Sequence, residues 1–190
     1  MTRPAGRTAR FASRKAAALT LAVGALSAPG LAITTAGAQA APAGSRGHSL
    51  LSSRELWATV DVCNPSDQPD TVGVRGSMPG DGHQHDTMYM RFQLQYLEAK
   101  TGTWTDLLHG GDSGFIAVGS AKSVRQGGTS FQLGAPVAGK PAYTLRGLVT
   151  FQWRHGTSVL HEATRMTSAG HQGVADADPA GYSAAQCAIA

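Results

Sequence analysis

The chain has 190 residues, of which 42% are hydrophobic and 15% are charged, and its formal net charge is +4. This composition is typical of a globular domain and argues against a disordered chain. Its two cysteines are too few for a disulfide-rich miniprotein or for a zinc site built on four cysteines.

The first 40 residues have the pattern of a secretory signal peptide. Five basic residues and no acidic residue precede or border an apolar run at 16–26. That run is shorter than the roughly 20 residues that span a bilayer, and the small residues at 38–40 suit a signal peptidase. The sequence therefore predicts cleavage after Ala40 and a secreted, extracytoplasmic protein.

Removal of residues 1–40 changes the charge balance and with it the expected partners. The remaining chain has 11 basic and 12 acidic residues, a net charge of −1. Without a basic patch nothing favours a nucleic-acid partner, and no later apolar stretch is long enough to span a membrane. We expect an extracellular or cell-surface partner, whose identity the sequence leaves open together with the oligomeric state.

Residues 41–54 are mainly small and polar, which predicts a flexible lead-in to a single domain at 55–190. Within that domain, apolar and polar residues alternate in short segments bounded by Gly, Pro, Asn and Asp, the pattern of half-buried strands. The segments expected to form strands are 56–62, 71–77, 88–97, 104–108, 115–118, 129–133, 143–153 and 157–166. The pattern of the last segment leaves open which of its two faces points inward.

Short strands at this spacing, without helical periodicity, favour an all-β fold in which two antiparallel sheets pack as a sandwich. We expect seven to eight strands. In the two longest segments one face is apolar, and Phe92, Leu94, Val149 and Phe151 lie on that face. These four side chains are therefore expected in the core.

The two cysteines are expected to pair. Exported proteins fold in an oxidising compartment, and Cys63 and Cys187 have no other cysteine available. A Cys63–Cys187 disulfide would tie the C-terminal tail, which has a loop-like composition after Gly170, to the first strand.

The strand pattern resembles that of immunoglobulin-like and fibronectin-like β-sandwiches, although Cys187 in the tail departs from the Cys–Trp–Cys spacing of antibody domains. Abundant Ala, Gly and Arg, scarce Lys and the presequence are similar to small secreted actinobacterial proteins. These resemblances imply export and a sandwich fold, and they imply no activity.

The polar faces of the two long strands supply the first candidate site. Long hydrogen-bonding side chains on neighbouring strands form a ladder, and Arg is favoured in binding surfaces. The residues of this possible binding face are Arg91, Gln93, Gln95, Arg146, Gln152 and Arg154.

A loop at 78–86 supplies a candidate metal site. His83 and His85 are two residues apart, so both imidazoles can reach one ion. Met88 and Met90 follow, and thioethers suit copper. The alternative to a binding module without a cofactor is therefore an extracytoplasmic copper- or zinc-binding protein.

No catalytic residues are predicted. The sequence Gly111-Asp112-Ser113-Gly114 is similar to the nucleophile motif of chymotrypsin-like proteases, but Phe115 follows it and no histidine has the context of that family's general base. We expect a secreted, non-catalytic β-sandwich that acts as a binding or structural module. A secreted hydrolase without a recognised motif is the remaining alternative.

Overall fold

The strongest alternation in the sequence becomes a pair of long antiparallel strands. In the computed structural model, which describes residues 49–139 and 141–190, β3 (Thr87–Glu98) pairs with β7 (Tyr143–His155). Their register runs from Thr87 opposite Arg154 to Tyr96 opposite Leu145. Because side chains alternate across a strand, this pairing gives one shared apolar face and one shared polar face.

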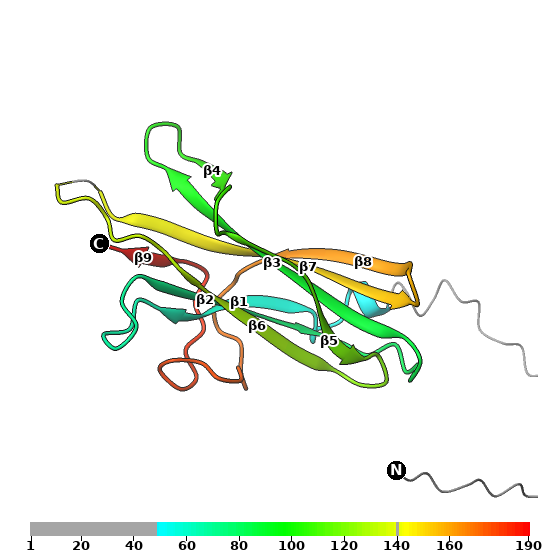
Figure 1. Cartoon of the computed structure of the whole chain (residues 1–190). Coiled ribbons are helices and arrows are strands. Elements are labelled where there is room, and N and C mark those ends of the chain that lie inside the picture. The colour runs from blue at the N-terminus through cyan, green and yellow to red at the C-terminus, as the bar shows by residue number, and fades with distance from the viewer. Residues whose placement is uncertain (1–48, 140) are drawn as a thin grey trace, which may run out of the picture. The chain divides into compact units, whose positions relative to one another are not determined.

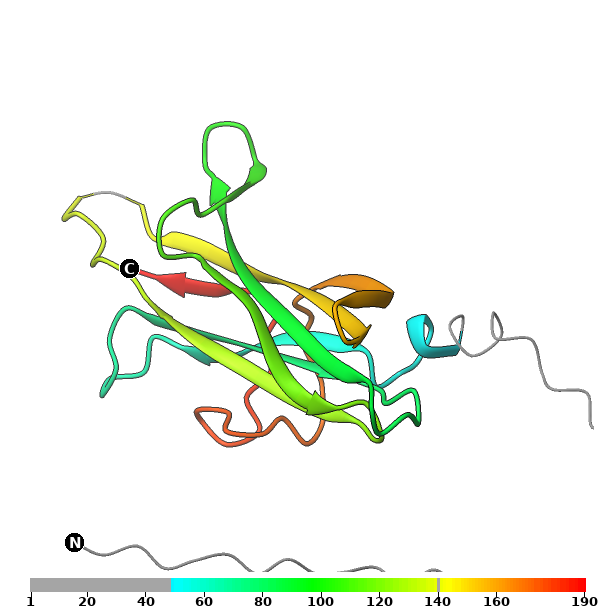
Figure 2. The same cartoon turned by 45° about the vertical axis from the view of Figure 1, so that its right-hand side comes forward.

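Two antiparallel sheets pack face to face, as Figures 1 and 2 show. The larger sheet has the order β4-β3-β7-β8, with β5 also pairing with β3 and β9 with β7. The smaller sheet has the order β1-β2-β6. The remaining strands are β1 (Trp57–Cys63), β2 (Thr71–Met78), β4 (Thr103–Asp106), β5 (Asp112–Ser120), β6 (Arg125–Gln132), β8 (Ser158–Met166) and β9 (Cys187–Ile189).

The core lies between the sheets. Phe92 is 1% exposed, and Leu94, Val149 and Phe151 are fully buried, which confirms the predicted apolar phase. A Cβ atom on Gly76 would lie 2.9 Å from Cε1 of Phe151. Glycine at position 76 therefore lets the smaller sheet approach the aromatic side chains of the larger one.

Nine strands lie in the described part of the chain, one more than the sequence predicts. The additional strand is β9, a three-residue segment that pairs with the start of β7. The predicted disulfide joins Cys63 to Cys187 across a Cα–Cα distance of 5.5 Å. The bond attaches β9 to the end of β1.

The outer face of the smaller sheet is covered by the segment between β8 and β9, which both views place on that side (Figures 1 and 2). The Thr59 hydroxyl lies 2.8 Å from the Ser183 hydroxyl, and Arg75 forms an ion pair with Asp176 at 3.2 Å. As a result β1 is buried on both faces, including Thr59 and Asp61. The period-two pattern predicts only half burial for this strand.

The ordered domain begins before Glu55, where the sequence analysis places its start. Leu50 lies within the expected flexible lead-in, yet it is only 6% exposed and belongs to the core cluster. A single helical turn carries it. The chain divides into units 1–39 and 40–190, and the expected signal peptide at 1–40 lies outside the described residues. Within 49–139 and 141–190, no helix is long and apolar enough to cross a bilayer.

Candidate functional site

The predicted polar face exists as one continuous surface. Because β3 and β7 are neighbours in register, Gln95 lies opposite Arg146 and Tyr89 opposite Gln152. The structure thus brings all six expected residues onto the outer face of the larger sheet. Gln152 is only 6% exposed on that face.

The three arginines of this face already form hydrogen bonds or ion pairs within the molecule. Arg91 forms a bidentate ion pair with Asp112. Arg146 donates to Gln95 at 2.8 Å, and its guanidinium lies 4.2 Å from the centre of the Trp104 ring. A partner at these positions has to displace existing contacts, so the binding role of this face remains a prediction.

Arg154 contacts two aromatic rings and a glutamine. Its guanidinium lies 4.2 Å from the centre of the Tyr89 ring and 4.7 Å from that of Phe115, and its Nε donates to Gln152 at 2.7 Å. Gln152 in turn donates to Glu162. Cation–π contacts attract a guanidinium to the face of a ring. They therefore favour one position of the Arg154 side chain.

The pair Arg91–Asp112 gives the face a testable pH dependence. The hydrogen bonds from Arg91 hold the pKa of Asp112 below its ordinary value of 3.8. A carboxyl with a lowered pKa in the folded state stabilises the fold above its unfolded pKa, and this contribution is lost as the pH falls through the folded pKa. We expect Asp112→Asn to lower the free energy of unfolding by up to about 1 kcal/mol at pH 7, with the difference vanishing well below pH 3.8.

Urea unfolding of the parent and the Asp112→Asn variant at pH 7 and at acidic pH measures this difference. Asp67→Asn is the control, because Asp67 is exposed and forms no ion pair in the described ranges. A difference that is independent of pH would contradict the assignment of the pKa shift to Arg91.

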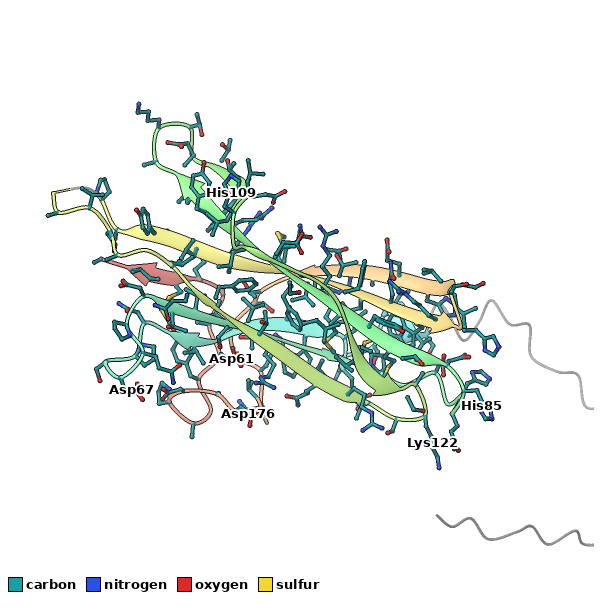
Figure 3. All side chains as sticks on the ribbon, viewed as in Figure 1. Asp61, Asp67, His85, His109, Lys122 and Asp176 are labelled. Carbon is teal, nitrogen blue, oxygen red and sulfur yellow. A yellow bond between two sulfur atoms is a disulfide. The ribbon has the colours of Figure 1, made fainter. Side chains whose placement is uncertain are left out.

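The predicted metal loop connects β2 to β3 and contains more potential ligands than its two histidines. Donor atoms of Asp81, His83 and Asp86 lie within 4.8 Å of one another. The exposed His85 is not part of this group, and it lies at the far end of the sandwich from His109 (Figure 3). Met88 and Met90 are fully buried in the core, so their thioethers are not available as ligands for a metal ion in this loop.

A further histidine approaches the loop from the last position of β7. His155 Nδ1 lies 2.6 Å from Asp86 Oδ1, and this contact lowers the pKa of Asp86 below its ordinary value. His155 could not be assigned to this loop from the sequence, because 69 residues separate it from Asp86. Asp81 and Asp86 flank the histidines in the sequence. Their positions could have indicated a site with both imidazole and carboxylate ligands.

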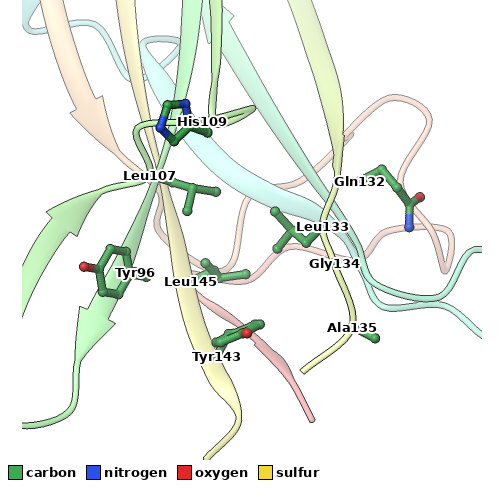
Figure 4. Close-up of a pocket in the computed structure, with 9 residues that line it drawn as sticks. All are labelled: Tyr96, Leu107, His109, Gln132, Leu133, Gly134, Ala135, Tyr143 and Leu145. Carbon is green, nitrogen blue, oxygen red and sulfur yellow. The ribbon is translucent and has the colours of Figure 1, made fainter. Parts of the chain in front are cut away.

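A cavity of about 420 Å³ opens at the other end of the sandwich, where β3 ends and β7 begins (Figure 4). Leu145 is buried at its floor, and Leu107 and Leu133 are partly buried against the core. Its lining consists of Tyr96, Leu107, His109, Gln132, Leu133, Gly134, Ala135, Tyr143 and Leu145.

The lining of this cavity is largely apolar, and among the described residues it contains no carboxylate, lysine or arginine. The Gln132 side chain points away from the cavity (Figure 4), since its amide donates to the Pro69 carbonyl and accepts from the Thr71 hydroxyl. A second hollow of about 260 Å³ adjoins the first and shares Tyr96 and Tyr143 with it. The residues come from separate strands and loops, so no local sequence motif could have indicated them.

A third, polar hollow of about 300 Å³ lies where the C-terminal segment covers the smaller sheet. Asp61 lines it and accepts a 2.7 Å hydrogen bond from Arg75, while burial raises the pKa of this carboxyl. Asp61 Oδ1 is enclosed without a hydrogen bond, and a Cβ on Gly73 would lie 2.5 Å from it. An atom enclosed in this way is out of reach of a ligand. Arg75 also pairs with Asp176 of the C-terminal segment at 3.2 Å, so we assign these ion pairs to holding that segment against the sheet.

The serine of the protease-like motif is engaged in the backbone. Ser113 Oγ accepts the Phe92 N–H at 2.9 Å and donates to the Gly114 carbonyl at 2.7 Å. A different serine, Ser168, lies 2.9 Å from His171 Nε2, and burial lowers the pKa of this histidine. In the described residues no carboxylate pairs with His171 to orient it as a general base requires.

Comparison with known protein families and with curated proteins finds no match to this chain.

Proposed function

We propose that the protein is an exported, non-catalytic binding module that holds a small, uncharged and mainly apolar molecule in the cavity at the open end of its sandwich. The observation that carries the proposal is the cavity itself, about 420 Å³ in volume, whose described lining residues include three leucines and two tyrosines and no aspartate, glutamate, lysine or arginine. Apolar concave sites of this size are typical of small-molecule binding.

The chemistry of the lining supports a neutral ligand. Transfer of apolar surface from water to the leucines of the cavity is favourable by about 25 cal/mol per Å². An ionised ligand would lose its hydration without meeting a counter-charge, which is strongly unfavourable. Tyr96, Tyr143 and His109 add aromatic rings to the lining.

The strand order supports an immunoglobulin-like connectivity for this module. In that fold strands A, B and E share one sheet, and strands G, F and C share the other, with C′ beside C in the variable type. The orders β1-β2-β6 and β8-β7-β3-β4 follow the same succession. Export is proposed from the signal-like residues 1–40 and is compatible with the disulfide.

Binding of the neutral fluorophore N-phenyl-1-naphthylamine tests the proposed site. Gly134 lines the cavity, its Cβ position has open space, and its φ lies outside the left-handed region, so Gly134→Phe is expected to fill the cavity without strain. We expect a fluorescence increase with the parent and binding weakened by about tenfold or more in this variant, a change of at least 1.4 kcal/mol.

Ala138→Phe is the matched control, because Ala138 is an exposed residue of the same loop that does not line the cavity. It should bind the fluorophore like the parent. Equal binding by the parent and Gly134→Phe would refute the site.

A further inference from the structure

The loop between β2 and β3 brings two acidic side chains together in a place where they are almost buried. The Asp81 and Asp86 side chains are 7% and 8% exposed, whereas the His83 ring beside them is 57% exposed. His83 Nδ1 lies 3.4 Å from Asp81 Oδ1 and 3.8 Å from Asp86 Oδ2. One imidazole nitrogen and two carboxylate oxygens thus face a common point at the surface.

The charge of this cluster is incompletely compensated within the chain. Across the described residues neither Asp81 nor Asp86 forms an ion pair with lysine or arginine, and their ion-pair partners are the imidazoles of His83 and His155. Two neighbouring carboxylates that are shielded from water repel each other, and buried charges in proteins are typically paired or bound to a metal. A divalent cation between them would supply the missing positive charge.

From this geometry we propose that Asp81, His83 and Asp86 form a Zn²⁺-binding site, at the end of β3 opposite to the cavity. The ligands of Zn²⁺ in proteins are imidazole nitrogens, carboxylate oxygens and thiolates at about 2.0–2.3 Å. Such bond lengths place donor atoms about 3–4 Å apart. The His83 Nδ1 distances of 3.4 and 3.8 Å to the two carboxylates lie in this range, and all three donor atoms lie within 4.8 Å of one another.

The loop holds its carboxylates in place before any ion arrives. Asp81 Oδ1 accepts the His83 N–H at 2.7 Å, and the Asp86 carbonyl accepts the Ala121 N–H at 2.8 Å. The Gly82 N–H donates to the Ala121 carbonyl at 3.1 Å. The turn between β5 and β6 is thus hydrogen-bonded to the loop both near Asp81 and at Asp86. His155, whose Nδ1 lies 2.6 Å from Asp86 Oδ1, acts as a positioning residue that orients the Asp86 ligand.

The donor set distinguishes Zn²⁺ from two other ions. Calcium takes six to eight oxygen ligands, while this cluster offers two carboxylates and a nitrogen. Copper(I) prefers soft sulfur ligands, and the methionines that follow the loop are buried in the core. A borderline divalent ion fits one imidazole and two carboxylates, with an open position on the exposed side of His83.

Isothermal titration of the purified, metal-free protein, prepared without a polyhistidine tag, tests the site with Zn²⁺ and with Ca²⁺. We expect one Zn²⁺ per chain, affinity lowered by about tenfold or more in His83→Ala, and a loss of similar size in Asp81→Asn. His85→Ala is the matched control, a neighbouring exposed histidine outside the cluster, and should bind within about twofold of the parent. His155→Ala should weaken binding by about 10-fold or more through Asp86.

Thermal unfolding verifies that His83→Ala, a substitution at an exposed side chain, remains folded. Absence of Zn²⁺ binding by the parent overturns the proposal, as does equal loss of affinity in His83→Ala and His85→Ala. Binding of Ca²⁺ as tight as that of Zn²⁺ overturns the assignment of the ion. Gly134→Phe should bind Zn²⁺ like the parent, so this result is independent of the cavity.

Discussion

Replacement of Phe151 by alanine is expected to lower the free energy of unfolding by about 3–5 kcal/mol. Phe151 is fully buried and lies opposite Met90 in the β3–β7 register. Its ring fills the space left by Gly76 of the other sheet, so truncation leaves a cavity at the contact between the two sheets. Urea unfolding followed by tryptophan fluorescence measures the loss.

Phe115→Ala is the matched control for this substitution. Phe115 is the same residue type on the outer face of the same sheet, and it is 37% exposed. Its loss should be smaller, because less apolar surface returns to water. A loss below about 1 kcal/mol for Phe151→Ala would contradict the description of the core.

Removal of the disulfide is the second change with a large expected effect. Replacing both Cys63 and Cys187 by serine should lower the free energy of unfolding by about 2–5 kcal/mol. The bond joins residues 124 positions apart, and in the chain-entropy model a long closed loop restricts the unfolded chain most. Among the described strands β9 pairs with the start of β7 alone, so the loss of backbone protection should be greatest at β9.

Urea unfolding measures the loss of unfolding free energy, and amide hydrogen exchange measures the local loss of protection at β9. The Cys63→Ser/Cys187→Ser variant should lose exchange protection at Ala188 and Ile189 before the centre of β7 is affected. The parent treated with a reductant serves as the control for the substitutions themselves. Unchanged stability and unchanged protection of β9 would contradict a stabilising role of the bond.

Most of the strands could be predicted from the sequence because their signal is local. In β3 and β7 apolar side chains alternate with polar ones over ten residues or more, and burial of one face fixes the register. The correct inward positions of Phe92 and Phe151 follow from that alternation alone. The disulfide was predictable for a different reason, since each cysteine has a single candidate partner.

Features that depend on distant contacts could not be predicted in this way. Thr59 and Asp61 alternate with apolar neighbours as solvent-facing residues do, yet the C-terminal segment covers them. β9 is three residues long, too short for a periodic signal. Its position depends on Cys63 and on the free edge of β7.

The candidate sites likewise include residues with a local sequence signal and residues that only the fold brings together. His83 was identified from the composition of its loop, whereas His155 reaches Asp86 from the end of β7, far along the chain. The cavity combines the end of β3, the start of β7 and the segment after β6. Strand pairing joins the first two segments, and packing of the two sheets adds the third. No local sequence pattern therefore indicates the site.

The location of a bound apolar probe tests the proposed function most directly. In ¹H–¹⁵N correlation spectra recorded during titration with N-phenyl-1-naphthylamine, the account predicts shifts of backbone amides around the cavity, at Tyr96, Gly134 and Leu145. The amides of Arg91 and Arg154 on the outer face of the larger sheet should remain unchanged. Shifts confined to that outer face, or no saturable shifts at the cavity, would contradict it.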